Sequence, residues 1–194
     1  MLLALAHDRR LLRYDARGNG LSQREVAEIS FECWVSDLGA VVDAAGYDRF
    51  ALVGLSQGVP ISIAYAARHP ERVSHLILYG GYARGLLRRP GDPDKLKQSL
   101  ELACGLIREG WGSEEESHRQ FFTTQFMPDS TAEQQRSMNA LQRISATPEV
   151  AERMLRVTAD IDVSDLLRQV KVPTMVLHVR GDLRAPFALG QEIA

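Results

Sequence analysis

Short apolar runs alternate with amphipathic helical stretches over the first 83 residues, and this alternation constrains the fold more than any other feature of the chain. Three runs have the length and the flanking turn residues of strands: Arg10–Tyr14, Phe50–Gly54 and Val73–Tyr79. Between them, residues 30–45 and 57–69 carry apolar side chains at helical spacing. Strands and helices joined in this way build parallel sheets with right-handed crossovers. We therefore predict an α/β fold.

Local sequence signals predict where these elements begin and end and which of their faces are buried. Ser30 is a typical N-cap residue and Gly46 a typical terminator, so they predict the ends of the first helix. Phe50–Gly54 is apolar throughout, which predicts a parallel strand with helices on both faces. Near the end of the chain, Val172–Val179 predicts a further strand that ends before Arg180-Gly181-Asp182.

From Arg84 to about Asp160 the pattern is helical only. A helix is expected to start at Asp92-Pro93 and to close at Gly110. Capping-box or N-cap spacing then marks three further helix starts, at Ser113–Glu116, Ser130–Glu133 and Thr147-Pro148-Glu149. We predict a mostly parallel core made of residues 1–83 and 161–194. Residues 84–160 would form an inserted helical cap over the strand ends.

Composition excludes several classes of protein. Hydrophobic residues make up 45% and charged residues 25%, with a net charge of −2 and a pI near 6.2. These values predict a cytoplasmic globular protein that binds neither nucleic acid nor membranes. The apolar start, Met1–Ala6, has no basic residues before it and no cleavage site after it, so we expect no signal peptide. Cys33 and Cys104 both fall in expected helices, which favours two free thiols.

The segment Gly54-Leu55-Ser56-Gln57-Gly58 joins an expected strand to an expected helix. A sharp turn there would need small residues at Gly54 and Gly58, and it would expose the Ser56 hydroxyl. The Gln57 N–H would lie at the helix N-terminus, where partial positive charge stabilises an oxyanion. We therefore predict that Ser56 is a nucleophile and that Gln57 is an oxyanion-hole donor. The alternative is that Ser56 only caps the helix.

Three other stretches carry a resemblance to a known family. Tyr14–Ser22 is similar to the Asp-x-Arg-Gly-x-Gly-x-Ser loop that follows the fourth strand of α/β-hydrolases. His69–Val73 with Leu76–Leu78 resembles the helix exit and sixth strand, and Val172–Asp182 resembles the seventh strand. The resemblance covers nearly the whole chain. It implies a partial α/β-hydrolase core in which Asp182 is the triad acid that orients a histidine.

The chain departs from the family pattern at the histidine. In the family this residue follows an eighth strand beyond the acid, but the 12 residues after Asp182 (194 − 182) contain no histidine. The family's first strands would also precede Met1, so we predict that the chain is a segment of a longer hydrolase. The five histidines are expected to be solvated, capping or packed: His7, His69, His75, His118 and His178.

Two functions remain open at this stage. The first is a serine hydrolase of small molecules with a carboxylic ester, thioester or lactone bond, which needs no cofactor and no metal. The second is a ligand-sensing domain that controls a fused or associated signalling domain, either a nucleotide cyclase or a DNA-binding regulator. The wording of Ala66–Tyr82, which is similar to hydrolase domains fused to such proteins, favours the second.

Other residues have two interpretations. Asp15 is expected to tie its own loop, and Asp182 could merely cap the next helix. Arg180 and Arg184 could meet an anionic substrate, although solvated arginines are the simpler interpretation. Five residues of the cap could line an acyl pocket or pack among themselves: Trp111, Phe121, Phe122, Phe126 and Met127.

Overall fold

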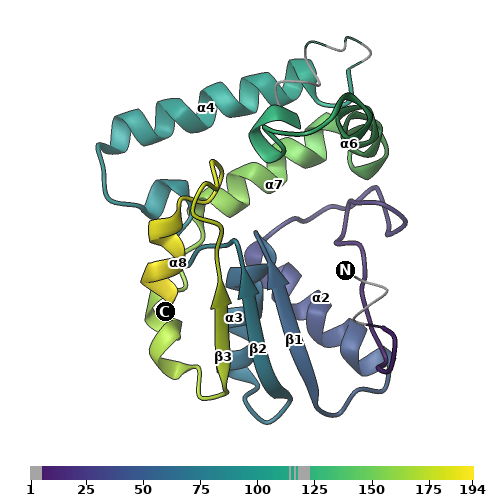
Figure 1. The fold of residues 1–194 in the computed structure, drawn as a ribbon, viewed down its shortest axis with the longest axis vertical. Coiled ribbons are helices and arrows are strands. Elements are labelled where there is room, and N and C mark those ends of the chain that lie inside the picture. Colours follow the sequence, from purple (N-terminus) through teal and green to yellow (C-terminus); the bar gives the residue numbers. More distant parts are fainter. Residues whose placement is uncertain (1–5, 114, 116, 118–122) are drawn as a thin grey trace.

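The computed structural model describes residues 6–113, 115, 117 and 123–194, and it confirms the α/β class. Within them, three parallel strands form one sheet in the order β1 (Phe50–Leu55), β2 (Val73–Tyr79), β3 (Thr174–Leu177). Helices α2 (Phe31–Ala44) and α3 (Gly58–Arg68) lie behind the sheet in Figure 1. The 3-10 helix η2 (Ser164–Gln169) precedes β3, and α8 (Phe187–Ile193) follows it.

Side-chain caps fix the helix starts where the sequence predicts them. The Ser30 hydroxyl accepts the Cys33 N–H at 3.2 Å, and Asp92 and Thr147 cap α4 (Pro93–Gly110) and α7 (Pro148–Asp160) in the same way. Helix α6 (Ala132–Ser145) begins one residue later than predicted. Its capping box joins Thr131 to Gln134, because the Ser130 hydroxyl instead donates to the Met127 carbonyl. The box predicted at Ser113–Glu116 includes residues outside those described.

Only one face of the sheet is covered by the described residues. Leu52, Leu76 and Leu78 point toward α3 and are buried. The opposite face carries two cross-strand rows, Val53–Ile77–Met175 and Leu55–Tyr79–Leu177. All of these except Ile77 are between 41% and 56% exposed. We predicted helices on both faces of Phe50–Gly54, but among the described residues helices pack only on the face that carries Leu52.

The strand predicted at Arg10–Tyr14 does not form, and this prediction is wrong. A strand requires a partner, but β1 pairs with β2 alone and its other edge is free among the described residues. The segment instead runs irregularly beside α2 (Figure 1). The Arg10 guanidinium holds it there, 4.6 Å from the centre of the Tyr47 ring.

Residues 84–160, which we call the lid segment, stand above the carboxyl ends of the strands in Figure 1. Besides α4, α6 and α7, the lid segment contains the 3-10 helix η1 (Leu86–Arg88). Its two ends meet: Arg84 pairs with Asp162 in an antiparallel bridge, and the Val163 N–H donates to the Ala83 carbonyl at 3.0 Å. The division of the chain into a core and a lid remains a prediction.

A second attachment joins the lid segment to the loop that follows Tyr14. The Gly20 N–H donates to the Ser145 carbonyl at 2.8 Å, and Arg24 donates to the Ile144 and Ser145 carbonyls. On α7, Arg153 donates to two carbonyls of the same loop. The lid segment is thus held at two separate places.

The two cysteines, Cys33 and Cys104, are free thiols. None of the helices in the described ranges combines the length and the apolar character needed to cross a membrane.

Candidate active site

Ser56 has the backbone geometry of a strained turn. It follows β1 directly, and its φ of +51° is the only positive value at a non-glycine residue among those described. Its N–H donates to the Tyr79 carbonyl at 2.9 Å, and its own carbonyl accepts the Val59 N–H at 3.0 Å. Such a conformation costs roughly 1–3 kcal/mol, and strain of this kind is concentrated at functional sites. The Ser56 residue is exposed, as a nucleophile must be.

Close packing around the turn explains part of its glycine content. A β-carbon on Gly54 would lie 2.7 Å from the Ser62 Oγ atom and 2.8 Å from the Gly58 carbonyl oxygen. Gly58 itself differs from the prediction, because a β-carbon there would meet nothing within 4 Å. Gly81 is a further residue of the turn that is not among the predictions, and a β-carbon there would lie 2.6 Å from the Ser56 carbonyl oxygen. The Gly80-Gly81 pair at the end of a strand is the sequence feature that indicates such a close approach.

The Gln57 N–H is available for a ligand. Gln57 is the N-cap residue of α3, and its N–H has no acceptor among the described residues. A free N–H at a helix N-terminus carries partial positive charge. Its use as an oxyanion-hole donor remains a prediction.

Asp182 lies at the same edge of the sheet as Ser56. Its Oδ1 atom accepts the N–H groups of Arg184 and Ala185, both at 2.8 Å, which fixes the carboxylate. Its Oδ2 atom would be 3.7 Å from a β-carbon on Gly80. Asp182 therefore adjoins Gly80, while the next residue, Gly81, adjoins Ser56. The same hydrogen bonds fit the capping alternative, so the triad role is untested.

No histidine among the described residues is placed to serve Ser56. His75 pairs with Ala51, five residues before Ser56, which is about 16 Å along a strand. His69 caps the far end of α3, about 15 Å along the helix from its start at Gly58. The ring of His178 packs on Gly190, and its Nε2 atom contacts the Ala185 carbonyl oxygen at 2.6 Å. His7 is exposed in the N-terminal segment, and His118 lies outside the described residues.

Asp15 closes its own loop, as expected. Its carboxylate accepts the Leu21 N–H at 2.9 Å, and its carbonyl accepts the Ser22 hydroxyl at 2.6 Å. The same loop is fastened to α2 by a two-pronged contact of Arg17 with Asp37, at 2.6 and 2.7 Å. This contact raises the pKa of the Arg17 guanidinium. These contacts give Asp15 a structural role.

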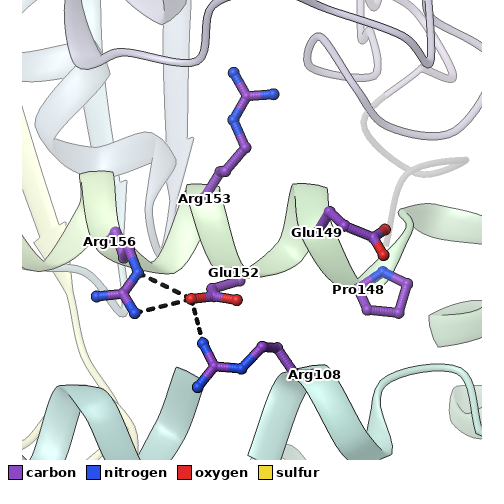
Figure 2. A pocket seen from close by; sticks show the side chains of 6 residues that line it. All are labelled: Arg108, Pro148, Glu149, Glu152, Arg153 and Arg156. Carbon is purple, nitrogen blue, oxygen red and sulfur yellow. Dashed lines mark hydrogen bonds and ion pairs between the residues drawn. The ribbon is translucent and has the colours of Figure 1, made fainter. Parts of the chain in front are cut away.

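Two cavities stand out, and neither is lined by Ser56 or Asp182. One of about 500 Å³ lies between the loop after Tyr14 and α2. The other, of about 440 Å³, lies between α4 and α7 (Figure 2). Three of the charged side chains that line it are already paired with one another, since Arg108 and Arg156 both donate to Glu152. Of the predicted acyl-pocket residues, Trp111 donates to the Ala146 carbonyl and Phe126 is 48% exposed. Phe121 and Phe122 lie outside the described residues.

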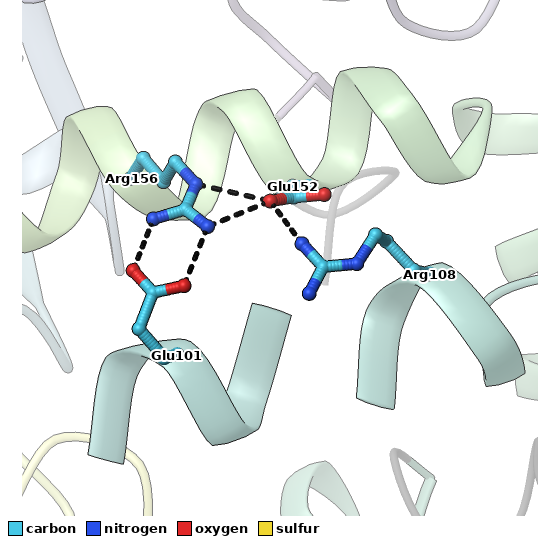
Figure 3. A network of polar contacts seen from close by, with 4 residues as sticks. All are labelled: Glu101, Arg108, Glu152 and Arg156. Atoms are coloured by element: carbon cyan, nitrogen blue, oxygen red, sulfur yellow. Dashed lines mark hydrogen bonds and ion pairs between the residues drawn. The ribbon is translucent and has the colours of Figure 1, made fainter. Parts of the chain in front are cut away.

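The network beside this cavity is centred on Arg156, which pairs with Glu101 and Glu152 (Figure 3). Hydrogen bonds from Arg156 lower the pKa of both carboxyl groups below 4.5. Their stabilising effect is therefore present above pH 4.5 and is lost as the pH falls through the lowered pKa values. We expect Arg156→Gln to lower the melting temperature at pH 7 and to make little difference in strong acid. Melting curves at both pH values test this.

Arg136→Gln is the matched control, because Arg136 is exposed on α6 and makes no ion pair within the described ranges. An Arg156→Gln effect that persists unchanged in acid would contradict the network's role.

The sequence model of a protein family described as alpha/beta hydrolase fold matches residues 1–190 of this chain. The chain belongs to the α/β-hydrolase fold family. Its curated relatives include the AB hydrolase superfamily protein YisY from Bacillus subtilis, with 29% identity over 95% of this chain and 68% of the relative. They also include pyrrolizixenacetamide deacetylase from Xenorhabdus hominickii, with 26% identity over 100% of this chain and 71% of the relative.

Solved structures with the α/β-hydrolase fold are similar to this chain over nearly its whole length. A hydrolase from Pseudomonas aeruginosa matches with a TM-score of 0.81 and 21% identity, over 100% of this chain and 70% of its own. The enol-lactonase from Burkholderia xenovorans matches with a TM-score of 0.71 and 23% identity, over 98% and 70%. The α/β-hydrolase chain thus spans about 70% of these structures. Within the described residues, no group of three or more side chains is placed to hold a metal ion.

Proposed function

We propose that this α/β-hydrolase chain carries the nucleophile and the acid of a serine hydrolase that acts on small molecules with an ester-like bond. The observation that carries the proposal is the left-handed backbone of Ser56, at a turn between β1 and α3. The names of the relatives support the class, since they include a deacetylase, an esterase and an enol-lactonase.

In the proposed mechanism the Ser56 hydroxyl attacks a carbonyl carbon. A histidine from outside these 194 residues accepts the hydroxyl proton and returns it to the leaving group. Asp182, whose Oδ1 atom is held by two N–H groups, orients that histidine through Oδ2. The Gln57 N–H stabilises the negative charge that develops on the carbonyl oxygen. Ester, thioester and lactone substrates all suit this chemistry, which requires no metal.

A fluorophosphonate probe tests the nucleophile. In a form of the protein long enough to include the histidine, the probe should label Ser56, and Ser56→Ala should abolish the label. Ser36→Ala is the matched control, because Ser36 is exposed on α2 and should not affect labelling. Labelling that persists in Ser56→Ala would refute the assignment. The sensor alternative, with its fused signalling domain, predicts no labelling of Ser56 at all.

A further inference from the structure

Three arginines gather where the chain leaves β2 for the lid segment and where the loop after Asp182 returns. Arg89 lies with its guanidinium carbon 5.6 Å from the centre of the Tyr82 ring, and Tyr82 is buried. Arg184 lies 5.4 Å from the centre of the Phe126 ring and donates to the Gln125 side chain at 2.6 Å. The third arginine, Arg84, comes from the start of the lid segment.

These arginines have too few carboxylate partners. Arg84 pairs with Glu192 at 2.5 Å, but its Nε atom is buried without an acceptor. Neither Arg89 nor Arg184 makes an ion pair with any residue that the structure describes. Among the described residues, Arg89 donates only to the Arg84 carbonyl, at 3.2 Å. Glu192, Asp182 and Asp162 lie near the three arginines, but none of them forms an ion pair with Arg89 or Arg184.

Several other arginines of the lid segment are paired with carboxylates. Arg88, one residue before Arg89, pairs with Asp160 at 3.0 Å, and Arg156 pairs with two glutamates. By contrast, partial burial lowers the pKa of both Arg89 and Arg184, and the charge of Arg184 lowers the pKa of Arg89 further. Arg89 is the half-buried one of the two, and a cation withdrawn from water without a counter-ion is costly. A bound anion would remove this cost.

We propose that Arg89 and Arg184 bind a carboxylate group of the substrate, so that the enzyme prefers ester-like substrates that carry an acidic group. The paired N–H donors of a guanidinium group match the two oxygens of a carboxylate. The site adjoins the proposed reaction centre, because the Arg184 N–H donates to the Asp182 carboxylate at 2.8 Å. Tyr82 directly follows Gly81, where a β-carbon would lie 2.6 Å from the Ser56 carbonyl oxygen. Arg89 is half-buried and Arg184 exposed, so both remain accessible. The proposal rests on the proposed function for its substrate, but anion binding can be measured without any reaction.

The test uses glutaric acid monoanilide and its neutral primary amide, neither of which contains an ester bond. Titration calorimetry at low salt uses the longer form of the protein, with Ser56→Ala to prevent any reaction. It should show the acid binding at least about tenfold more tightly, because only the acid offers the guanidinium groups a charged acceptor. Arg89→Gln and Arg184→Gln should each remove this preference. Arg88→Gln, whose partner is Asp160, should keep it.

A second measurement needs no variant. The acid should protect Arg89 and Arg184, but not Arg88, from modification by phenylglyoxal, as read by peptide mass spectrometry. Equal binding of the two probes, no binding of either, or equal protection of Arg88 would each overturn the proposal. Because no hydrolysis is involved, these outcomes are independent of fluorophosphonate labelling at Ser56, which tests the proposed function.

Discussion

Residues 1–194 alone should hydrolyse a nitrophenyl ester about 10⁶-fold more slowly than a longer form in which a histidine reaches Ser56. Without a base, the serine hydroxyl stays protonated at neutral pH. The described histidines do not provide one, because His75 and His69 lie far from Ser56 and His178 is engaged by the Ala185 carbonyl. Steady-state hydrolysis by the two forms, each with its Ser56→Ala variant, measures the difference.

Comparable turnover by the two forms, abolished in both by Ser56→Ala, would contradict this expectation. It would mean that a histidine within the 194 residues serves as the base. Thermal melting should be recorded in parallel. No described strand pairs with the outer edges of β1 and β3. These edges and the apolar rows Val53–Ile77–Met175 and Leu55–Tyr79–Leu177 should make the shorter form less stable and more prone to aggregate.

Gly81→Ala should lower the free energy of unfolding by about 3 kcal/mol, at the upper end of the usual cost of overpacking. The added β-carbon would lie 2.4 Å from the Val59 β-carbon and 2.6 Å from the Ser56 carbonyl oxygen. One belongs to the turn at Ser56 and the other to the first turn of α3, and both have little room to move. Urea denaturation measures the change, and fluorophosphonate labelling should fall with it because Ser56 is displaced.

Gly58→Ala is the control from the same turn. Nothing lies within 4 Å of a β-carbon there, and Gly58 opens α3. Alanine favours a helix over glycine by up to about 1 kcal/mol, so this variant should be as stable as the parent or slightly more so. A Gly58→Ala variant as unstable as Gly81→Ala would show that the packing argument is wrong.

Local signals made most helices predictable from the sequence. The bounds of α4 follow from Asp92, Pro93 and Gly110, because a cap acts on the backbone a few residues away. Strand formation depends on distant partners instead. Arg10–Tyr14 has a strand-like composition, yet it stays irregular since no described strand pairs with it. The uncovered face of β1 has the same origin, because an apolar run does not reveal which neighbours are present.

The candidate site, too, could be predicted only in part from the sequence. Ser56 and Asp182 could be placed at one edge of the sheet, because both follow the carboxyl ends of parallel strands. The contact of Gly81 with the turn could not, since it joins segments more than 20 residues apart. A solvated Arg184 is the prediction from the sequence, and the residue is indeed exposed. Its contacts with Gln125 and Phe126 come from a segment about 60 residues away, so no local pattern indicates them.

The meeting of the two ends of the lid segment has a consequence for how proteins of the α/β-hydrolase fold diversify. A segment that leaves and re-enters at one hydrogen-bonded pair, Ala83 with Val163, can change in length without moving β2 or β3. The sheet edge that carries Ser56 and the lid segment above it can then vary separately in sequence and length. An exchange at this junction would still have to satisfy one further constraint, because Arg24 and Arg153 fasten the far side to the loop after Tyr14.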